Sequence, residues 1–318
     1  MRLLTSPSIV VTMNTNLNDQ LNVYQARPGA RNGHRMAYDA ARTITLLFGG
    51  RDDADRSLGD TWGWDGVRWR KLSSAGPGPR SWHTVTYDKE KKAVVLFGGR
   101  DASEKPLGGT WEWNGTDWRL VSTKGPPARD HHAMTYDSIR KRVVLHGGYD
   151  GTRVIEDTWE WDGQEWFIVA SSGPSARATH HITFDPRLGR TLLYGGLDLT
   201  GKVFADTWGW NGESWKELGA EEGDGRTHFS MTYDAIREAV VRFGGKDLQR
   251  VPYGDLWQFE GNKWVLKTPA GPPARIDHAL VFDQNRGKLV LFGGKIPNRD
   301  GPVFGDLWEW DHTGWEQR

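Results

Sequence analysis

The stretch Leu47-Phe48-Gly49-Gly50 decides the fold, because its pattern returns six times along the 318-residue chain. In each copy an aromatic or histidine residue precedes a pair of glycines. This residue falls at Phe48, Phe97, His146, Tyr194, Phe243 and Phe292, so that successive copies lie 49, 49, 48, 49 and 49 positions apart. A period this regular over nearly the whole chain predicts six copies of one supersecondary unit.

Each copy reads as four short strands, which we name A to D in chain order. In the third copy they are expected at residues 128–137, 142–148, 157–161 and 165–169, where β-branched and aromatic residues are bounded by turn residues. An Asx-Gly pair favours a tight hairpin between C and D, as in Asp65-Gly66, Asn114-Gly115, Asp162-Gly163 and Asn211-Gly212. The glycine pair that ends strand B suits a positive φ or a close approach of another chain segment.

Six units of four strands predict an all-β fold, a six-bladed β-propeller of four-stranded antiparallel blades. The hydrophobic-Gly-Gly of strand B, the aromatic residue of strand C and the Trp of strand D resemble the kelch motif. The resemblance extends over residues 27–318 and is to a bacterial-like single-domain form. It implies the kelch propeller fold, but kelch propellers serve as binding modules, enzyme domains and scaffolds, so it does not fix the function.

The repeat divides the chain into a propeller domain at residues 27–318 and an N-terminal extension at residues 1–26. Within the extension, residues 9–11 or 21–24 are candidates for an extra edge strand near the last blade, where a covered edge would block pairing with other chains. The alternative is a tail without regular structure. The sixth copy contains all four of its own strands.

Most of the 18 tryptophans follow the repeat. Strand C carries a Trp-x-Trp pair in every copy except the fifth, which has Trp257/Phe259. The D strands start at Trp69, Trp118, Trp166, Trp215, Trp264 and Trp315. Large aromatic side chains at repeated positions are expected to pack between blades. Only Trp82 lies outside this register.

Composition narrows the possible partners and the compartment. The 41 basic and 41 acidic side chains give no net charge, so electrostatics does not favour nucleic acid or a membrane surface as the main partner. The absence of cysteine excludes disulfides and thiol chemistry and is compatible with a reducing compartment. No apolar run approaches the length of a membrane span. We therefore expect a cytoplasmic monomer that binds neither nucleic acid nor membrane.

The D–A and B–C loops share one face of a propeller, and we call this face around the axis the mouth. Strand A starts with Arg in every copy, at Arg31, Arg80, Arg129, Arg177, Arg226 and Arg275. His follows three residues later, except at Phe229, and an Asp ends each B–C loop, except at Gly109. Residues repeated in every blade are expected to be scaffold, with Arg–Asp bonds that tie neighbouring blades together.

Two other mouth positions depart from the repeat. Two residues after each Arg stand Gly33, Trp82, His131, Thr179, His228 and Asp277, and directly after each glycine pair stand Arg51, Arg100, Tyr149, Leu197, Lys246 and Lys295. Aromatic, histidine and cationic groups around one opening predict a site for a polar or anionic ligand. The predicted binding residues are Trp82, Arg100, His131, Tyr149, His228, Lys246, Arg51 and Lys295. The alternative is ordinary surface variation.

Two functions fit this site. The first is a binding module for a small anionic or aromatic ligand, or for a peptide or protein. The second is a cofactor-independent lyase, isomerase or cyclase acting on a small molecule, with His131, His228 or His83 as general base and an Arg that stabilises an anion. No Walker loop, His-Glu-x-x-His or G-x-G-x-x-G motif occurs, so we expect no metal and no cofactor.

The kelch resemblance also implies two enzyme types that can be compared with the chain. A galactose-oxidase-type copper site requires a cysteine, which is absent, and the iron-binding pattern of plant specifier proteins, E-x-x-x-D-x-x-x-H, does not occur. Both types are therefore disfavoured. Because no motif singles out a base or nucleophile, the sequence favours the binding module and leaves enzymatic activity open.

Overall fold

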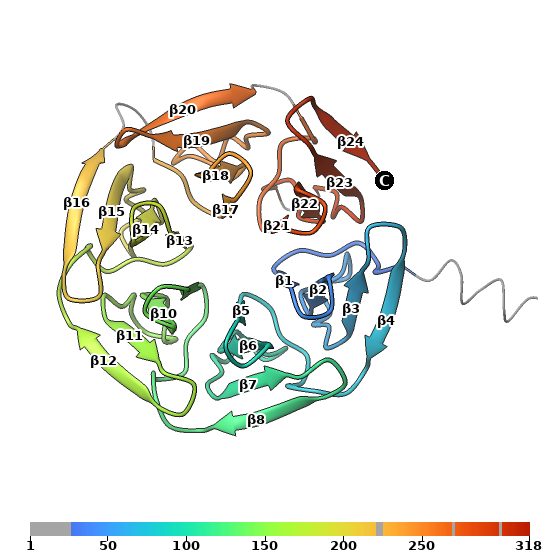
Figure 1. Ribbon diagram of the computed structural model, residues 1–318, viewed down its shortest axis with the longest axis horizontal. Coiled ribbons are helices and arrows are strands. Elements are labelled where there is room, and N and C mark those ends of the chain that lie inside the picture. The colour runs from blue at the N-terminus through green and yellow to red at the C-terminus, as the bar shows by residue number, and fades with distance from the viewer. Residues whose placement is uncertain (1–26, 221–224, 269–270, 299–300) are drawn as a thin grey trace, which may run out of the picture.

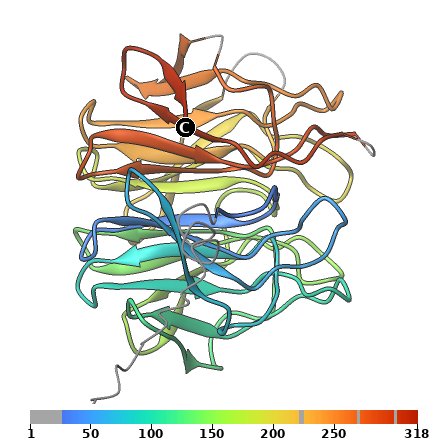
Figure 2. The same cartoon turned by 90° about the vertical axis from the view of Figure 1, so that its right-hand side faces the viewer.

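The computed structural model describes residues 27–220, 225–268, 271–298 and 301–318, and six four-stranded antiparallel sheets surround one central axis (Figure 1). The predicted six-bladed propeller is confirmed. These residues form no helix, so none long and apolar enough to cross a membrane occurs among them. The N-terminal extension, with its predicted edge strand, lies outside the described residues. Seen from the side, the strands run between the two loop-bearing faces of the propeller (Figure 2).

Within each blade the strands follow one another in chain order from the axis outward (Figure 1). Blades 1 to 3 comprise β1 (Arg35–Asp39), β2 (Ile44–Phe48), β3 (Thr61–Trp64), β4 (Trp69–Ser73), β5 (Thr84–Asp88), β6 (Ala93–Phe97), β7 (Thr110–Trp113), β8 (Trp118–Ser122), β9 (Ala133–Asp137), β10 (Arg142–His146), β11 (Thr158–Trp161) and β12 (Trp166–Ala170). Blades 4 to 6 comprise β13 (His181–Asp185), β14 (Arg190–Tyr194), β15 (Asp206–Trp210), β16 (Trp215–Ala220), β17 (Ser230–Asp234), β18 (Ala239–Phe243), β19 (Leu256–Glu260), β20 (Lys263–Thr268), β21 (Ala279–Asp283), β22 (Lys288–Phe292), β23 (Leu307–Trp310) and β24 (Trp315–Gln317).

Strand A is shorter than predicted. In blade 3 it was expected from residue 128, but β9 begins at Ala133. His131 has a φ of 52°, in the left-handed region, which an extended strand does not enter. The segment before the strand is therefore a turn, and it belongs to the mouth.

The glycine pair marks the place where the next blade crosses. Gly49 and Gly50 have φ values of 67° and 98°, and a Cβ on Gly49 would lie 2.6 Å from the carbonyl oxygen of Arg80 in blade 2. The Gly50 N–H donates to that same carbonyl at 2.9 Å. Both the backbone angle and the close approach exclude a side chain here, which explains the sequence signature.

The tryptophans that start the D strands pack between blades, as predicted. Trp166 of blade 3 is 8% exposed and meets the ring of Phe97 in blade 2 edge-on at 5.6 Å. Its Nε1 donates to Thr110 Oγ1 at 2.8 Å, so the indole is both buried and hydrogen-bonded. Trp69, Trp118 and Trp264 are equally buried, whereas Trp215 and Trp315 are half-buried.

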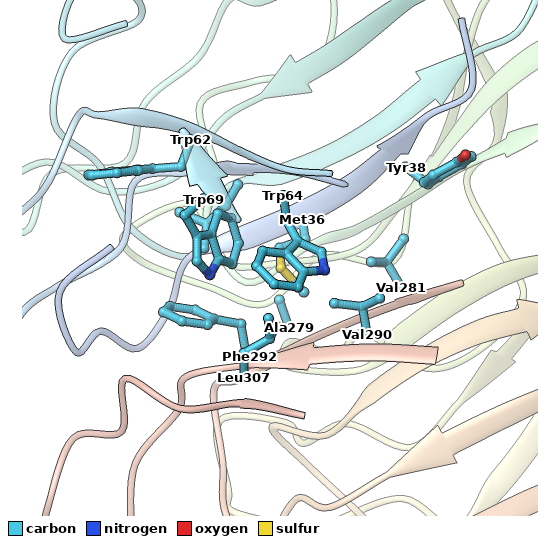
Figure 3. Packing of buried hydrophobic residues seen from close by; sticks show 11 residues of the cluster. Met36, Tyr38, Trp62, Trp64, Trp69, Ala279, Val281, Val290, Phe292 and Leu307 are labelled. Atoms are coloured by element: carbon cyan, nitrogen blue, oxygen red, sulfur yellow. The ribbon is translucent and has the colours of Figure 1, made fainter. Parts of the chain in front are cut away.

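Blade 6 contains its own four strands, and among the described residues no strand is exchanged with blade 1. Phe292 of blade 6 packs against Trp69 of blade 1 at 5.2 Å between ring centroids (Figure 3). Trp64 Nε1 donates to Glu309 Oε1 at 3.1 Å, and Gly294 N–H donates to the Arg31 carbonyl at 2.8 Å. The bond from the second glycine of the pair to the Arg carbonyl of the next blade therefore closes the ring as it joins every other pair of blades.

The repeated Arg side chain does not bridge blades, contrary to our expectation. In five blades it binds the Asp that ends the B–C loop of its own sheet, as Arg129 binds Asp157. Contact with the preceding blade comes instead from the main-chain carbonyl of the Arg. Blade 2 has Gly109 in place of the Asp, so Arg80 donates to the carbonyls of Pro77 and Gly98, and burial lowers its pKa to about 10.

Candidate functional site

The six residues that stand two positions after each Arg form a closed main-chain ring at the mouth, which we call the mouth ring. All six have φ between 52° and 64°: Gly33, Trp82, His131, Thr179, His228 and Asp277. Each N–H donates to the carbonyl of the preceding member at 2.8–3.2 Å, and Gly33 completes the circle by donating to Asp277. A left-handed conformation is unfavourable for most side chains, so the ring of hydrogen bonds is what holds them there.

The residue after each glycine pair is also held by main-chain bonds. Arg51 exchanges two hydrogen bonds with Asn32, at 2.8 and 2.9 Å, and the equivalent pair recurs in every blade. Backbone geometry at this position is therefore constant, while the side chain varies. This arrangement presents Arg51, Arg100, Tyr149, Leu197, Lys246 and Lys295 around the mouth.

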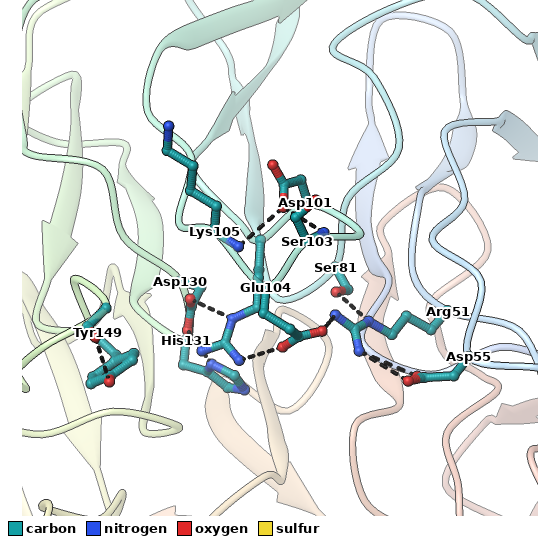
Figure 4. A network of polar contacts seen from close by, with 12 residues as sticks. Arg51, Asp55, Ser81, Asp101, Ser103, Glu104, Lys105, Asp130, His131 and Tyr149 are labelled. Carbon is teal, nitrogen blue, oxygen red and sulfur yellow. Dashed lines mark hydrogen bonds and ion pairs between the residues drawn. The ribbon is translucent and has the colours of Figure 1, made fainter.

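On blades 1 to 3 the mouth arginines are paired with carboxylates (Figure 4). Arg100 binds both carboxylate oxygens of Asp130, at 2.8 and 3.1 Å, and also Glu104 Oε2 at 2.8 Å. Arg51 binds the other oxygen of Glu104 and reaches Asp55 at 3.3 Å. Glu104 thus joins two arginines from neighbouring blades, and neither guanidinium is left as an isolated cation.

Aromatic groups fill the centre of this side of the mouth. Trp82 stacks on His131 with 4.8 Å between ring centroids, and the guanidinium of Arg51 lies 4.5 Å from the Trp82 ring. Asp130 Oδ1 lies 2.5 Å from His131 Nδ1, which fixes the orientation of the imidazole. Burial alone would raise the pKa of Asp130, but His131 and Arg100 outweigh it, so that the pKa of this carboxyl is lowered.

On blades 5 and 6 the mouth cations are not ion-paired with any residue that the structure describes. Lys246 and Lys295 are half-buried, and neither ammonium forms an ion pair with any described residue. Burial lowers the pKa of Lys246, and Asp277 partly offsets that effect. Burial lowers the pKa of His228 to about 3. Asp277 is buried, which alone would raise its pKa, but His228 and Lys295 outweigh burial and lower it.

The structure places all eight residues that were predicted to bind a ligand around the mouth, Tyr149 among them. The Tyr149 ring lies 5.8 Å from the Arg100 guanidinium, and its hydroxyl donates to the Gly151 carbonyl. His83, proposed as a possible base, lies elsewhere: it is fully buried between blades and meets Phe48 edge-on at 5.3 Å. A ligand at the mouth does not reach this ring.

Sequence reasoning missed the acidic half of the mouth. Asp130 and Glu104 pair the arginines, and Asp277 lies beside His228 and the lysines. A signal for Asp130 was present, because the position after the repeated Arg also varies, through Asn32, Ser81, Asp130, Ala178, Thr227 and Ile276. Among the described residues no cluster of three or more His, Asp or Glu has the arrangement of a metal site.

The two ends of the central channel differ in width. Beneath the mouth ring the void lined by His131, His228 and Asp277 measures about 10 Å³. At the opposite face, where the A–B turns lie, the channel opens into a cavity of about 420 Å³. The channel is therefore narrow beneath the mouth ring and wide at the opposite face.

The kelch resemblance is supported by comparison with known families. A profile of the KLHDC2/KLHL20/DRC7 Kelch-repeats domain matches residues 64–216, from the end of β3 to the start of β16. The chain is a kelch-repeat propeller. The same glycine pairs, strands and Trp positions continue through blades 5 and 6 beyond the match, so the kelch pattern covers the whole ring. A search of curated proteins gave no match.

Proposed function

We propose that this kelch propeller binds an acidic segment of a partner protein at its mouth. The observation that carries the proposal is the pair of half-buried lysines on adjacent blades, Lys246 and Lys295. They form no ion pair with a described residue, although the charge of the buried Asp277 reaches both. An exposed anion that reached them would gain charge-assisted hydrogen bonds without first breaking an existing pair.

The rest of the mouth suits a peptide better than a bare anion. Trp82 and Tyr149 offer aromatic surface on the side opposite the lysines, and Arg100 lies close to both rings. Aromatic and arginine side chains are the residue types that contribute most at protein interfaces. An acidic segment with an apolar or aromatic residue would therefore contact both sides of the mouth at once.

Catalysis at the mouth is less well supported by the same geometry. His131 is oriented by Asp130, as a general base is in many enzymes, and His228 is neutral. The void beside them is only about 10 Å³, however, which is no more than a water molecule requires. The arginines that would stabilise an anion are already paired with Glu104 and Asp130. Recognition at the surface is the function that these features favour.

The proposal is tested with a fluorescein-labelled Glu-Glu-Trp-Glu-Glu peptide and fluorescence anisotropy. We expect measurable binding to the wild-type propeller, and at least a tenfold loss in the double variant Lys246→Gln/Lys295→Gln. Binding should also weaken as salt rises from 50 to 300 mM, because the attraction between exposed charges is screened over about 8–10 Å at ordinary ionic strength.

The matched control is Lys91→Gln/Lys92→Gln, which removes two exposed lysines from an A–B turn on the opposite face. This variant should bind the peptide like the wild type. An equal loss in both double variants, or no binding by the wild type at millimolar peptide, would contradict the proposal.

A further inference from the structure

The central channel contains a wide chamber at the face opposite the mouth, lined by apolar side chains and by threonine and tyrosine side chains. Its volume is about 420 Å³, within the range of roughly 300–1,000 Å³ that small-molecule sites occupy. Each blade contributes one apolar residue from strand A, namely Met36, Val85, Met134, Ile182, Met231 and Leu280, and a Tyr or Phe two positions further on. The chamber is open to solvent beside the A–B turns, where Lys89 lines its rim.

A narrower void of about 40 Å³ adjoins the chamber on the side towards the mouth. The two share Met36, Val85 and Met134 in their linings, so they are consecutive parts of one channel. The narrow part is also lined by Arg35 and His181. A water molecule requires about 10–15 Å³ by this kind of measure, so the narrow part has room for a small polar group.

Arg35 breaks the repeat at this depth. It is the first residue of β1, and the equivalent residues of the other blades are Thr84, Ala133, His181, Ser230 and Ala279. Its Nη1 donates to the His34 carbonyl at 2.9 Å, while its Nε is buried without a hydrogen-bond partner. No carboxylate of the described residues forms an ion pair with it, although Asp277 offsets part of the effect of burial on its pKa, which is lowered.

His181 adds a second polar group to the same place. Its Nδ1 is buried without a partner. Burial, and then the charge of Arg35, lower the pKa of His181 to about 3, so the imidazole is neutral. The charged groups here are the Arg35 guanidinium in the narrow part and the Asp277 carboxylate, which lines the adjoining void beneath the mouth ring and forms no ion pair with Arg35. An unpaired cation away from bulk water is costly, and an anionic group placed beside it would offset that cost.

We propose that the channel binds an amphipathic monocarboxylate, with its carboxylate at Arg35 and its apolar body in the chamber. The ligand enters from the face of the A–B turns, and its head group lies next to the void beneath the mouth ring, which Arg35 and His181 also line. The apolar walls account for the body and the unpaired guanidinium for the head group. The narrow volume near Arg35 limits the head group to about the size of a carboxylate.

Isothermal titration calorimetry with octanoate, 4-phenylbutyrate and 1-octanol tests this proposal. We expect at least one of the two carboxylates to bind tenfold more tightly than 1-octanol. Arg35→Met should remove that tenfold advantage and leave 1-octanol binding unchanged. Octanoate has a flexible chain and 4-phenylbutyrate an aromatic ring, so comparing their affinities distinguishes a lipid-like ligand from a compact aromatic one.

Two further variants keep the result interpretable. Thr86→Phe, on the chamber wall, should weaken both octanoate and 1-octanol by filling the space that their chains occupy. Lys263→Met, on the outer strand β20 and away from the channel, should leave octanoate binding within twofold of wild type. If Arg35→Met leaves the carboxylate preference intact, or if neither carboxylate binds more tightly than 1-octanol, the proposal is wrong. Arg35→Lys, which retains the charge, replaces Arg35→Met as the decisive variant if the latter does not fold, and should preserve the preference.

Discussion

Arg129 holds Asp157 by two parallel hydrogen bonds, Nη1–Oδ1 at 2.5 Å and Nη2–Oδ2 at 3.0 Å, and the same guanidinium donates to the Gly147 carbonyl. The second carboxylate oxygen also accepts from Trp159 Nε1 at 2.8 Å. One ion pair thereby joins the start of strand A, the end of strand B and the B–C loop of its blade. The arrangement recurs in every blade except the second.

We predict that Arg129→Met destabilises the propeller by about 3–5 kcal/mol, because it leaves a shielded carboxylate without its partner. Arg80→Met should cost clearly less, since Arg80 has no carboxylate to abandon. Urea denaturation followed by tryptophan fluorescence measures both. Equal losses for the two variants would show that the carbonyl bonds, and not the ion pair, carry the stability.

Trp166→Ala is expected to destabilise by about 3–5 kcal/mol, as truncation of a large buried aromatic side chain does. Its indole fills the space between blades 2 and 3, so the loss combines lost burial and a cavity. The matched variant Thr110→Val removes only the acceptor of the indole N–H and should cost about 1–3 kcal/mol. An unchanged melting temperature for Trp166→Ala would contradict this account of the blade interface.

Acid should weaken the fold well before its carboxylates titrate. Burial lowers the pKa of eight histidines. Five stand at the repeated position of strand A, namely His34, His83, His132, His180 and His278, and the other three are His146, His181 and His228. Their folded-state pKa lies below the unfolded value near 6.5, so the unfolded chain gains protons that the folded chain does not. Stability is therefore complete above about pH 6.5 and falls as the pH drops below it, by up to about 1.4 kcal/mol per pH unit for each histidine.

His83→Phe provides the control for this pH dependence. Phe229 already occupies the equivalent position in blade 5 and packs against Tyr194 as His83 packs against Phe48. The variant should fold and should take up about one proton fewer on unfolding between pH 6.5 and 4.5. Denaturant titrations across this range give the slope. A slope unchanged by the substitution would mean that His83 titrates alike in both states.

Glu104→Gln should strengthen the binding of the acidic peptide at the mouth several-fold. The substitution removes the carboxylate shared by Arg51 and Arg100, which leaves both guanidiniums less neutralised. Fluorescence anisotropy measures the change. Glu90→Gln, at an A–B turn on the opposite face where Glu90 pairs with Lys141, serves as the control and should have no effect. Weaker binding by Glu104→Gln would indicate that the network must stay intact to form the site.

The sequence by itself determined the architecture. The glycine pairs, the tryptophans and the four strands of each unit repeat because every blade meets its neighbour through the same contacts, so a local pattern predicts the global fold. The same period also identified the mouth positions at which the residue differs from blade to blade. Their common location was predictable because antiparallel strands return alternate loops to one face.

Only the tertiary structure decided which charged side chains are already paired with a neighbour and which can bind a ligand. Arg51 and Glu104 lie 53 positions apart, and their pairing depends on how adjacent blades are spaced, which no local pattern encodes. Arg35 was overlooked because a charged residue beginning a strand is ordinary in sequence. It becomes unusual only when six inner strands surround an axis and place the half-buried guanidinium inside a channel, where its Nε has no hydrogen-bond partner.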